Sequence, residues 1–304
     1  MNKLSAVISV YNEEKNIERC LKSLDFADEI IVVDNSSTDK TVEVAKKYTD
    51  KVFTQKNDPS AIDLQKNFGF EKASSEWILS LDGDEEISKE LREEIKYATK
   101  KTTIVNGYWI PRQNFIFGKW IEHSGWYPDY QLRLFKKGKG KFINKHVHEP
   151  LTIEGETGHL RHNIIHHNYE TILQFVQKNI IVYAPNEAEE LLKKGYEFSF
   201  FDAIKLPLNE FLSRFFARKG YKDGYHGLML ALLMAFYYFV VFAYIWEKNG
   251  FKQYDKGNFL NDTEKEVKNA GKDILYWMSK EKIGSMKNPI KRGIRKITKK
   301  IYEI

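Results

Sequence analysis

The sequence predicts an α/β protein built on a Rossmann-like, doubly wound and mainly parallel sheet. Short apolar runs alternate with segments whose apolar residues recur every three or four positions, as strands alternate with helices. Three predicted strands run directly into polar clusters, at Tyr11–Glu13, Asp34–Asp39 and Asp82–Glu85. Because ligands bind beyond the carboxyl ends of the strands in such sheets, the three clusters predict one ligand site.

The predicted elements follow in order along the first 100 residues. The strands are Leu4–Val10, Glu29–Val33, Lys51–Thr54 and Trp77–Leu81. The helices are Ile17–Leu24, Thr41–Tyr48 and Gln65–Ala73, and Asn12 is expected to cap the first of them. Residues 101–170 are expected to complete the domain, with strands at Gly107–Ile110 and Gln131–Phe135 and a loop over the site at Asn114–Tyr127.

Composition limits the classes of protein. At 304 residues, the chain is long enough for one large domain or two smaller ones. A net charge of +6, with 30% charged residues, does not suggest a nucleic-acid partner. A single cysteine, Cys20, excludes an intramolecular disulfide framework and suits a reducing compartment. The apolar run Leu4–Val10 is too short for a signal peptide.

The segment Asp82-Gly83-Asp84 is the first candidate for chemistry. Side chains two apart on an extended backbone point the same way, and Gly83 adds no side chain that could block a ligand. Two carboxylates at the end of a strand suit Mg²⁺ or Mn²⁺, and such a metal in turn suits a diphosphate. The alternative is a solvated turn before a helix N-terminus, where acidic residues are favoured.

Several motifs in this order resemble family 2 glycosyltransferases, which have the GT-A fold. They are Val7–Glu14 (VISVYNEE), Val32–Thr41 (VVDNSSTDKT), Lys66–Gly69 (KNFG) and Leu81–Glu85 (LDGDE). The resemblance covers about residues 1–100. Farther on, Trp126–Phe135 and Val147–Glu149 are similar to the bacterial subgroup that contains the lipopolysaccharide core glucosyltransferases.

The resemblance implies a nucleotide-sugar site, residue by residue. Tyr11, Asn12 and Glu13 would border the base and ribose, Asp34 would accept hydrogen bonds from them, and Lys66 and Asn67 would lie along the nucleotide. Asp82 and Asp84 would hold the metal, with Asp84 the more direct ligand. Each residue also has a structural alternative: Asn12 and Asn67 could cap or bend the backbone, Asp34 could cap a helix, and Glu13 could be surface charge.

The resemblance also suggests a general base. In inverting family members a carboxylate at the place of Asp129 takes the proton, usually as the Asp of a Glu-Asp pair, and here Pro128 replaces the Glu. Glu149 is the second candidate for this role. Arg133 could neutralise phosphate or acceptor charge, or could form a structural ion pair with Asp129.

Histidines are concentrated in the second half of the predicted domain. Seven of the eight lie between His123 and His167. We expect His148 to take the third metal position, which many GT-A enzymes fill with a histidine, or else to be a hydrogen-bonded structural residue. A zinc site lacks tight ligand spacing. We expect His166 and His167 to be structural.

Residues 171–304 predict a helical region that associates with a membrane, through helices within residues 205–247. Leu206-Pro207 is expected to break a helix, after which Phe211–Phe216 offers an aromatic face near Arg214 and Arg218. Gly227–Trp246 carries no charge and is about 30 Å long as a helix. It could enter the membrane shallowly, span it or be buried in the protein. Nine basic residues between Lys280 and Lys300 would attract acidic lipid.

The sequence thus predicts an inverting glycosyltransferase at the cytoplasmic face of a bacterial inner membrane, peripheral or monotopic, with a single span as the alternative. It would move a sugar from a nucleotide-diphosphate donor, expected to be a UDP-sugar, to a lipid-linked saccharide or another cell-envelope glycan. The rival functions are a metal-dependent nucleotidyltransferase and an inactive protein that binds sugar nucleotides or lipid. The sugar, the linkage and the oligomeric state are not predicted.

Overall fold

The computed structural model describes residues 3–58, 61–100, 104–143, 151–255 and 257–284. Contacts divide the chain into two units. The first, here called the α/β unit, comprises residues 1–120 and 126–170. The second, the helical unit, comprises residues 121–125 and 171–304. Each unit is described by itself.

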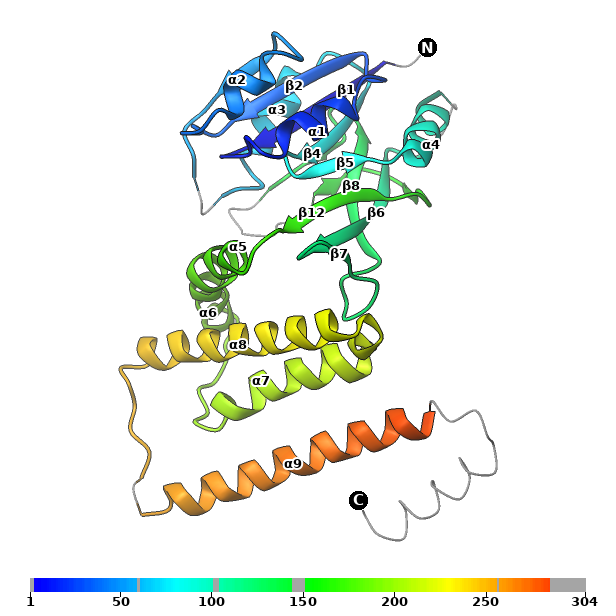
Figure 1. Cartoon of the computed structure of the whole chain (residues 1–304). Helices are drawn as coiled ribbons and strands as arrows, with labels where there is room; N and C mark the ends of the chain where they lie inside the picture. The colour runs from blue at the N-terminus through cyan, green and yellow to red at the C-terminus, as the bar shows by residue number, and fades with distance from the viewer. Residues whose placement is uncertain (1–2, 59–60, 101–103, 144–150, 256, 285–304) are drawn as a thin grey trace. The chain divides into compact units, whose positions relative to one another are not determined.

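The α/β unit is built on one mixed sheet with the strand order β3-β2-β1-β4-β8-β6-β12-β5 (Figure 1). The parallel part consists of β1 (Leu4–Val10), β2 (Glu29–Asp34), β3 (Val52–Thr54) and β4 (Trp77–Asp82). The rest consists of β5 (Glu85–Ile87), β6 (Gly107–Ile116), β8 (Asp129–Lys136) and β12 (Ile164–Tyr169). Short strands β7 (Lys119–Trp120) and β11 (Thr157–His159) also pair with β6. The parallel order confirms the predicted fold class.

Helices cover both faces of the parallel strands. Successive side chains of β1 point to opposite faces, so Ala6 and Ile8 enter one core and Val7 enters the other. The first core is completed by helices α1 (Ile17–Lys22), α2 (Thr41–Ala45) and α4 (Lys89–Lys100). The second is completed by α3 (Lys66–Lys72). Burial on both faces explains why these strands are continuous apolar runs in the sequence.

The loop predicted at Asn114–Tyr127 begins later than expected. Strand β6 continues to Ile116, because it pairs with β8 on one side and with β12 on the other. Asn114 is therefore a strand residue, with only 1% of its surface exposed. A small separate sheet joins β9 (Gly140–Lys141) to β10 (Thr152–Ile153).

The helical unit begins with α5 (Ile172–Phe175), a π-helix at Val176–Tyr183 and α6 (Ala184–Lys193). Helix α7 (Asp202–Leu212) leads through a second π-helix, Ser213–Ala217, and a 3-10 turn, Gly220–Asp223, into α8 (Tyr225–Lys248). Helix α9 (Phe259–Gly284) is the last described element.

Pro207 does not break a helix, contrary to the prediction. It lies inside α7, where it removes one N–H donor, and packing of α7 against α8 holds the helix together. The two helices are joined tightly: a Cβ on Gly227, in the first turn of α8, would lie 1.8 Å from the carbonyl oxygen of Gly220. Only glycine fits at that approach.

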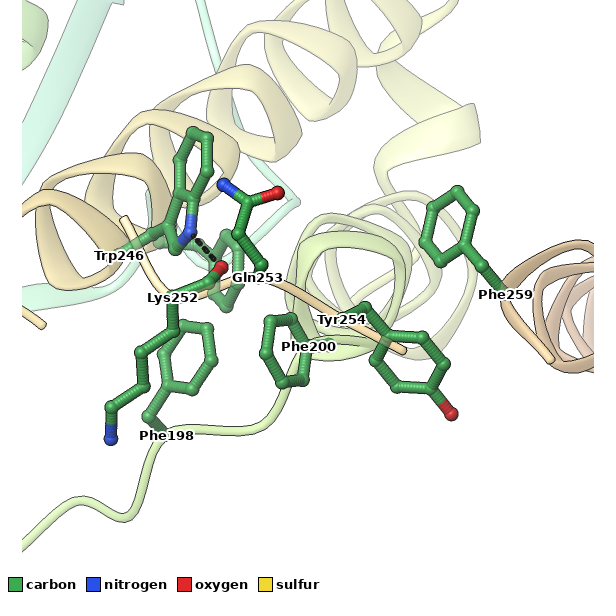
Figure 2. Close-up of a pocket in the computed structure, with 8 residues that line it drawn as sticks. Phe198, Phe200, Trp246, Lys252, Gln253, Tyr254 and Phe259 are labelled. Atoms are coloured by element: carbon green, nitrogen blue, oxygen red, sulfur yellow. Dashed lines mark hydrogen bonds between the residues drawn. The ribbon is translucent and has the colours of Figure 1, made fainter. Parts of the chain in front are cut away.

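Helix α8 is the one helix in the described chain that is long and apolar enough to cross a membrane, by length and composition. Residues on one side, such as Leu230, Val241 and Ile245, are buried in the helical unit, whereas Leu232, Phe236 and Phe239 are exposed. At the C-terminal end of α8, aromatic side chains surround a pocket (Figure 2).

Candidate active site

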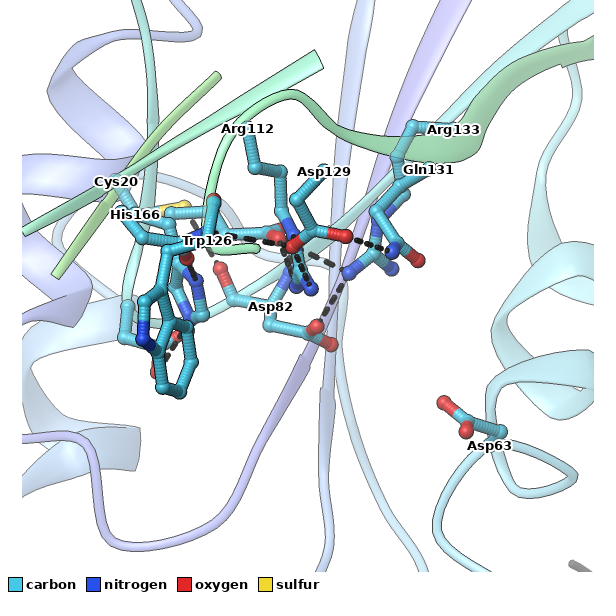
Figure 3. Close-up of polar contacts among 12 residues, drawn as sticks. Cys20, Asp63, Asp82, Arg112, Trp126, Asp129, Gln131, Arg133 and His166 are labelled. Carbon is cyan, nitrogen blue, oxygen red and sulfur yellow. Dashed lines mark hydrogen bonds and ion pairs between the residues drawn. The ribbon is translucent and has the colours of Figure 1, made fainter. Parts of the chain in front are cut away.

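Strand pairing brings Asp82 and Asp129 to the same edge of the α/β unit. Asp82 is the last residue of β4 and Asp129 is the first residue of β8. The two strands are antiparallel neighbours, with Leu79 opposite Leu134, so the end of one lies beside the start of the other. Figure 3 shows the two carboxylates within one cluster of polar side chains.

Asp129 is held by residues of β6 and β8. Its partner across the sheet is Arg112, whose Nε and Nη2 donate to Oδ2 at 2.8 and 2.6 Å. Gln131 Nε2 donates to Oδ1 at 2.8 Å. Burial raises the pKa of Asp129, but Arg112, Gln131 and Asn114 outweigh it and leave the pKa below its ordinary value. The carboxylate is therefore ionised and oriented at neutral pH.

Arg133 does not pair with Asp129, so that alternative was wrong. Its Nη2 donates to Asp82 at 2.6 Å and to Glu85 at 3.0 Å. Lys66 Nζ approaches the other oxygen of Asp82 at 2.7 Å. Burial opposes ionisation of Asp82, yet the two cations lower its pKa well below the ordinary range.

Ion pairs form a chain of alternating charges through the site, and Figure 3 labels Asp129, Arg112, Arg133 and Asp82 within it. Glu85 is fully buried, and its Oε1 accepts from Arg133 and also from Arg112 Nη1, at 3.3 Å. The order from the candidate base is Asp129, Arg112, Glu85, Arg133, Asp82, Lys66 and Asp63. Removing one member would leave a buried charge uncompensated, which is costly in a low-dielectric interior.

Asp84 lies in the turn between β4 and β5, and not on an extended backbone as predicted. His166 Nε2 is 3.4 Å from its Oδ2, and His166 Nδ1 is 2.6 Å from Asn114 Oδ1. The sheet register explains this arrangement, since His166 pairs with Asn114 on one side and with Glu85 on the other. His166 thus has its Nδ1 oriented by an amide and its Nε2 directed at a carboxylate.

Gly83 has a packing role that the sequence did not reveal. A Cβ at Gly83 would lie 2.9 Å from Val10 Cγ1 and 3.0 Å from Glu13 Cγ. Glycine is needed there because the strand ends approach closely, which is a different reason from the open ligand approach that we expected.

The donor set suits a divalent cation in chemistry and charge. Counting His166 as neutral, five carboxylates face three cations, which leaves two negative charges among Asp63, Asp82, Asp84, Glu85, Asp129, Lys66, Arg112 and Arg133. Carboxylate oxygens are the ligands that Mg²⁺ and Mn²⁺ prefer. Among the described residues, no three Asp, Glu, His or Cys side chains are grouped as a complete metal site. His148 and Glu149, the predicted third ligand and alternative base, lie outside the described residues.

The predicted nucleotide residues form a second cluster at the ends of β1 and β2. Asn12 does not cap a helix, since α1 begins at Ile17 after Asn16. It has a positive φ of 56°, and its Oδ1 accepts from the Thr38 backbone N–H at 2.8 Å. Buried Asp34 accepts from the Ser37 N–H at 3.0 Å. Both side chains form hydrogen bonds within the loop. Asp34 does not cap the next helix, contrary to its structural alternative, because α2 begins at Thr41 after Lys40.

The other predicted donor residues differ in their surroundings. Tyr11 is 46% exposed, and its ring is available to a ligand. Glu13 Oε2 accepts from Asn16 at 2.9 Å. Asn67 uses both ends of its amide on the backbone of Phe142, at 2.8 and 3.0 Å, so it braces that segment. Lys66, one residue away, faces Asp82.

Arg112 and Asn114 were missed by the sequence analysis, and Glu85 was placed in a polar cluster without a role of its own. Arg112 and Asn114 stand two apart on β6, so they share a face, and both reach Asp129. The signal that could have found them is a buried-strand pattern interrupted by polar residues, since a charged residue inside a strand usually has a partner there.

Comparison with known proteins identifies the family of the chain. The model of the family described as "Glycosyl transferase family 2" matches residues 5–152. A "Lipopolysaccharide core biosynthesis glycosyltransferase LpsC" from Rhizobium meliloti (strain 1021) is 28% identical over 255 residues, which is 82% of this chain and 94% of that protein. An "Uncharacterized glycosyltransferase" from Rickettsia typhi is 30% identical over 261 residues, 81% of this chain and 88% of that one.

Solved structures are more distant. Staphylococcus aureus TarS (residues 1–349), in complex with UDP-GlcNAc, has a TM-score of 0.44 and 16% identity, over 83% of this chain and 93% of that chain. Similarity at this level does not specify a ligand or a reaction. The family model and the sequence relatives confirm the resemblance found in the motifs, and they favour a glycosyltransferase over the nucleotidyltransferase alternative. The chain belongs to glycosyltransferase family 2, and its α/β unit represents the GT-A fold class of that family.

Proposed function

We propose that this glycosyltransferase moves a sugar from a UDP-sugar to a lipid-linked saccharide of the bacterial cell envelope, with inversion at the anomeric carbon. The observation that supports this most is the ion chain that joins Asp129 to Asp82. The chain links Asp129, the candidate base, to Asp82, which pairs with the two cations proposed below for the donor phosphates. The name of the Rhizobium relative, which refers to lipopolysaccharide core biosynthesis, supports an acceptor of that class.

Asp129 is the proposed general base. It would accept the proton of the acceptor hydroxyl as that oxygen attacks the anomeric carbon, and in doing so would form the acid that later releases the proton to water. Arg112 and Gln131 fix the direction of its oxygens. Because its pKa is lowered, Asp129 is ready as a base over the whole physiological pH range.

Asp84, with His166 beside it and Asp82 near it, is the proposed metal site. Asp84 and His166 offer an oxygen and a nitrogen 3.4 Å apart, and His166 Nδ1 is held at Asn114 Oδ1 as the second ring nitrogen of a metal-binding histidine usually is. In this proposal His166 takes the third metal position, which we expected of His148. When bound, Mg²⁺ or Mn²⁺ would neutralise the leaving diphosphate.

Lys66 and Arg133 are the proposed cations for the donor phosphates. Both are buried, and both pair with Asp82 in this structure. Within the described chain, Arg133 Nε is buried without a hydrogen-bond partner, and an acceptor oxygen from a ligand would satisfy it. A bound diphosphate would therefore compete with Asp82 for the same two side chains. Tyr11, in the loop after β1, is 46% exposed and offers its ring to the base of the donor.

The helical unit is the proposed membrane-associating part, which would keep the enzyme at the cytoplasmic face of the inner membrane. Support comes from α8 and from the apolar side chains exposed around it. Phe216 is buried and Arg214 pairs with Glu210, so the Phe211–Phe216 segment contributes less to such a surface than the sequence suggested. The basic tail beyond Gly284 lies outside the described residues.

A donor panel tests the proposal. Purified protein with Mn²⁺ would be offered UDP-glucose, UDP-galactose, UDP-N-acetyl sugars and GDP-mannose, and release of nucleoside diphosphate would be measured with and without EDTA. We expect release from a UDP-sugar that EDTA abolishes, and a product of inverted anomeric configuration by NMR. Retained configuration, or a preference for GDP-mannose, would contradict the proposal, and a protein that only binds would release no nucleotide.

A further inference from the structure

An aromatic pocket in the helical unit has no part in the site described above (Figure 2). Its volume is about 330 Å³, within the range of small-molecule sites. Six of its eight lining residues are aromatic, and the full set is Phe198, Phe200, Phe242, Trp246, Lys252, Gln253, Tyr254 and Phe259.

The polar atoms of the two amphipathic rings are already engaged. Trp246 Nε1 donates to the backbone oxygen of Lys252 at 2.9 Å, as the dashed line in Figure 2 marks. The Tyr254 hydroxyl donates to Asp262 at 2.7 Å. The rings therefore offer carbon surfaces to the cavity. A hydrocarbon chain suits such walls, whereas a sugar or a base would lose hydrogen bonds to water without regaining them.

The ring packing gives the pocket a defined shape. Phe198 is stacked on Phe242 with centroids 5.6 Å apart, and Phe200 meets Phe198 and Tyr254 edge-on at 4.9 and 5.0 Å. Arrays of this kind are favourable in their own right, beyond the area that they bury. The opening is therefore lined by side chains that are already ordered against one another.

Lys252 is the only charged side chain among the lining residues that the structure describes. Its Nζ lies 5.9 Å from the ring centroid of Phe198, and no carboxylate pairs with it within the described chain. A cation beside an apolar cavity favours a ligand with an anionic head. It disfavours a quaternary ammonium ligand, which aromatic cages otherwise bind well.

The surroundings of the pocket indicate where such a ligand comes from. Fourteen of the twenty exposed large hydrophobic residues in the described chain belong to the helical unit. Phe259, which lines the pocket, and Phe251, one residue before Lys252, are each 50% exposed. Trp246 and Lys248 stand at the end of the apolar helix α8, and Trp and Lys are enriched where such helices meet lipid headgroups.

We propose that this pocket holds one hydrocarbon chain of an anionic membrane lipid, with the phosphate of that lipid at Lys252. The apolar walls bind the chain, and the ammonium group selects the head. This site does not depend on the transfer reaction, because it lies wholly within the helical unit. Its test therefore measures binding alone, and failure here would leave the proposed transferase function intact.

The test measures binding of dodecyl phosphate, below its micelle concentration, to the full-length protein by calorimetry. We expect saturable binding of one molecule per chain, weaker binding of uncharged dodecyl maltoside, and none of inorganic phosphate. Phe200→Asp should weaken binding at least tenfold. Lys252→Gln should remove the preference for the phosphate head. Phe236→Asp, on the exposed side of α8 and outside the pocket, is the matched control and should bind as the wild type does.

A second measurement needs no variant. A dodecyl phosphate carrying a diazirine at the chain end should label peptides that contain Phe198–Phe200 or Phe242–Tyr254 in the wild-type protein, and phosphatidylglycerol vesicles should compete. Labelling spread evenly over the helical unit would overturn the proposal. Equal binding by Phe200→Asp and Phe236→Asp would also overturn it. Two further results would overturn it: competition by inorganic phosphate as effective as that by the lipid, and a dimer in solution that buries the pocket.

Discussion

Arg112 donates to Asp129 Oδ2 from both Nε and Nη2, at 2.8 and 2.6 Å, from the position directly across the sheet. The same guanidinium reaches the fully buried Glu85 through Nη1. Arg112 thus fixes the direction of the proposed base and lowers its pKa, while tying it to the carboxylate that also binds Arg133. We therefore propose that Arg112 positions Asp129.

Arg112→Gln should raise the pKa of Asp129, because burial then acts with less opposition. The acid limb of kcat/KM should move to higher pH, and kcat should fall by about one to two orders of magnitude as the base loses its fixed orientation. The pH dependence of kcat/KM is the measurement. Exposed Arg161→Gln is the control, and a purely structural Arg112 would lower activity equally at every pH.

Asp84→Asn removes one ligand charge at nearly constant size. Affinity for Mn²⁺ in the presence of UDP, measured by electron paramagnetic resonance, should fall at least tenfold, and turnover of the donor by at least about two orders of magnitude. His166→Ala should weaken Mn²⁺ binding in the same direction. Exposed His159→Ala should not. Unchanged Mn²⁺ affinity in Asp84→Asn, together with turnover in EDTA, would refute the metal site.

Glu29 gives a pH-dependent part of the stability of the α/β unit. Burial raises its pKa, but hydrogen bonds from Lys51, Ser5 and Ser74 prevail and lower it to about 2 from 4.5. Because this pKa is lower in the folded state, ionised Glu29 stabilises the fold fully above about pH 4.5. This stabilisation is lost as the pH falls toward 2. Glu29→Gln should therefore cost up to about 3 kcal/mol at pH 7 and clearly less at pH 3.

Urea unfolding at the two pH values measures this difference. Glu93→Gln is the matched control, because Glu93 pairs with Lys96 on the exposed side of α4 and should contribute little at either pH. An equal loss for Glu29→Gln at pH 7 and pH 3 would show that the effect is packing and not ionisation.

Membrane attachment should depend on the exposed side of α8. A high-salt wash should leave most of the full-length protein on phosphatidylglycerol vesicles, because apolar burial is not screened by salt. The double variant Phe236→Ser/Phe239→Ser should be released, whereas Tyr97→Ser, at a 69% exposed site of the α/β unit, should stay bound. If the wild-type protein purifies without detergent and does not bind vesicles at low salt, α8 is a core or dimer helix and the membrane proposal is contradicted.

The local patterns of the sequence were sufficient for the parallel half of the fold. Strands such as Leu4–Val10 and Trp77–Asp82 are apolar on both faces, because helices cover both sides of the sheet. Asp82 and Asp129 could be chosen as site residues because each stands at a strand end, and the resemblance gave their roles.

The contacts between distant strands could not be predicted in this way. Arg112 faces Asp129 and Asn114 faces His166 because of strand register, and register is a long-range property that no local pattern specifies. The same reason explains why the predicted strand Gly107–Ile110 is shorter than β6, and why the contacts of His166 with Asn114 and Asp84 were not predicted. Pro207 lies inside α7, and not at the predicted break, because packing against α8 overrides its local preference.

The central claim, that Asp129 is the base of a glycosyl transfer, is tested most directly by Asp129→Asn. The UDP-sugar that the donor panel identifies would be used to measure both donor Kd and kcat for transfer to acceptor. We expect a Kd within about twofold of the wild type and a kcat lower by about two to four orders of magnitude, because only the transition state needs the proton acceptor. A variant that transfers sugar at the wild-type rate would contradict the claim, and a crippled Glu149→Gln beside it would give the role to Glu149.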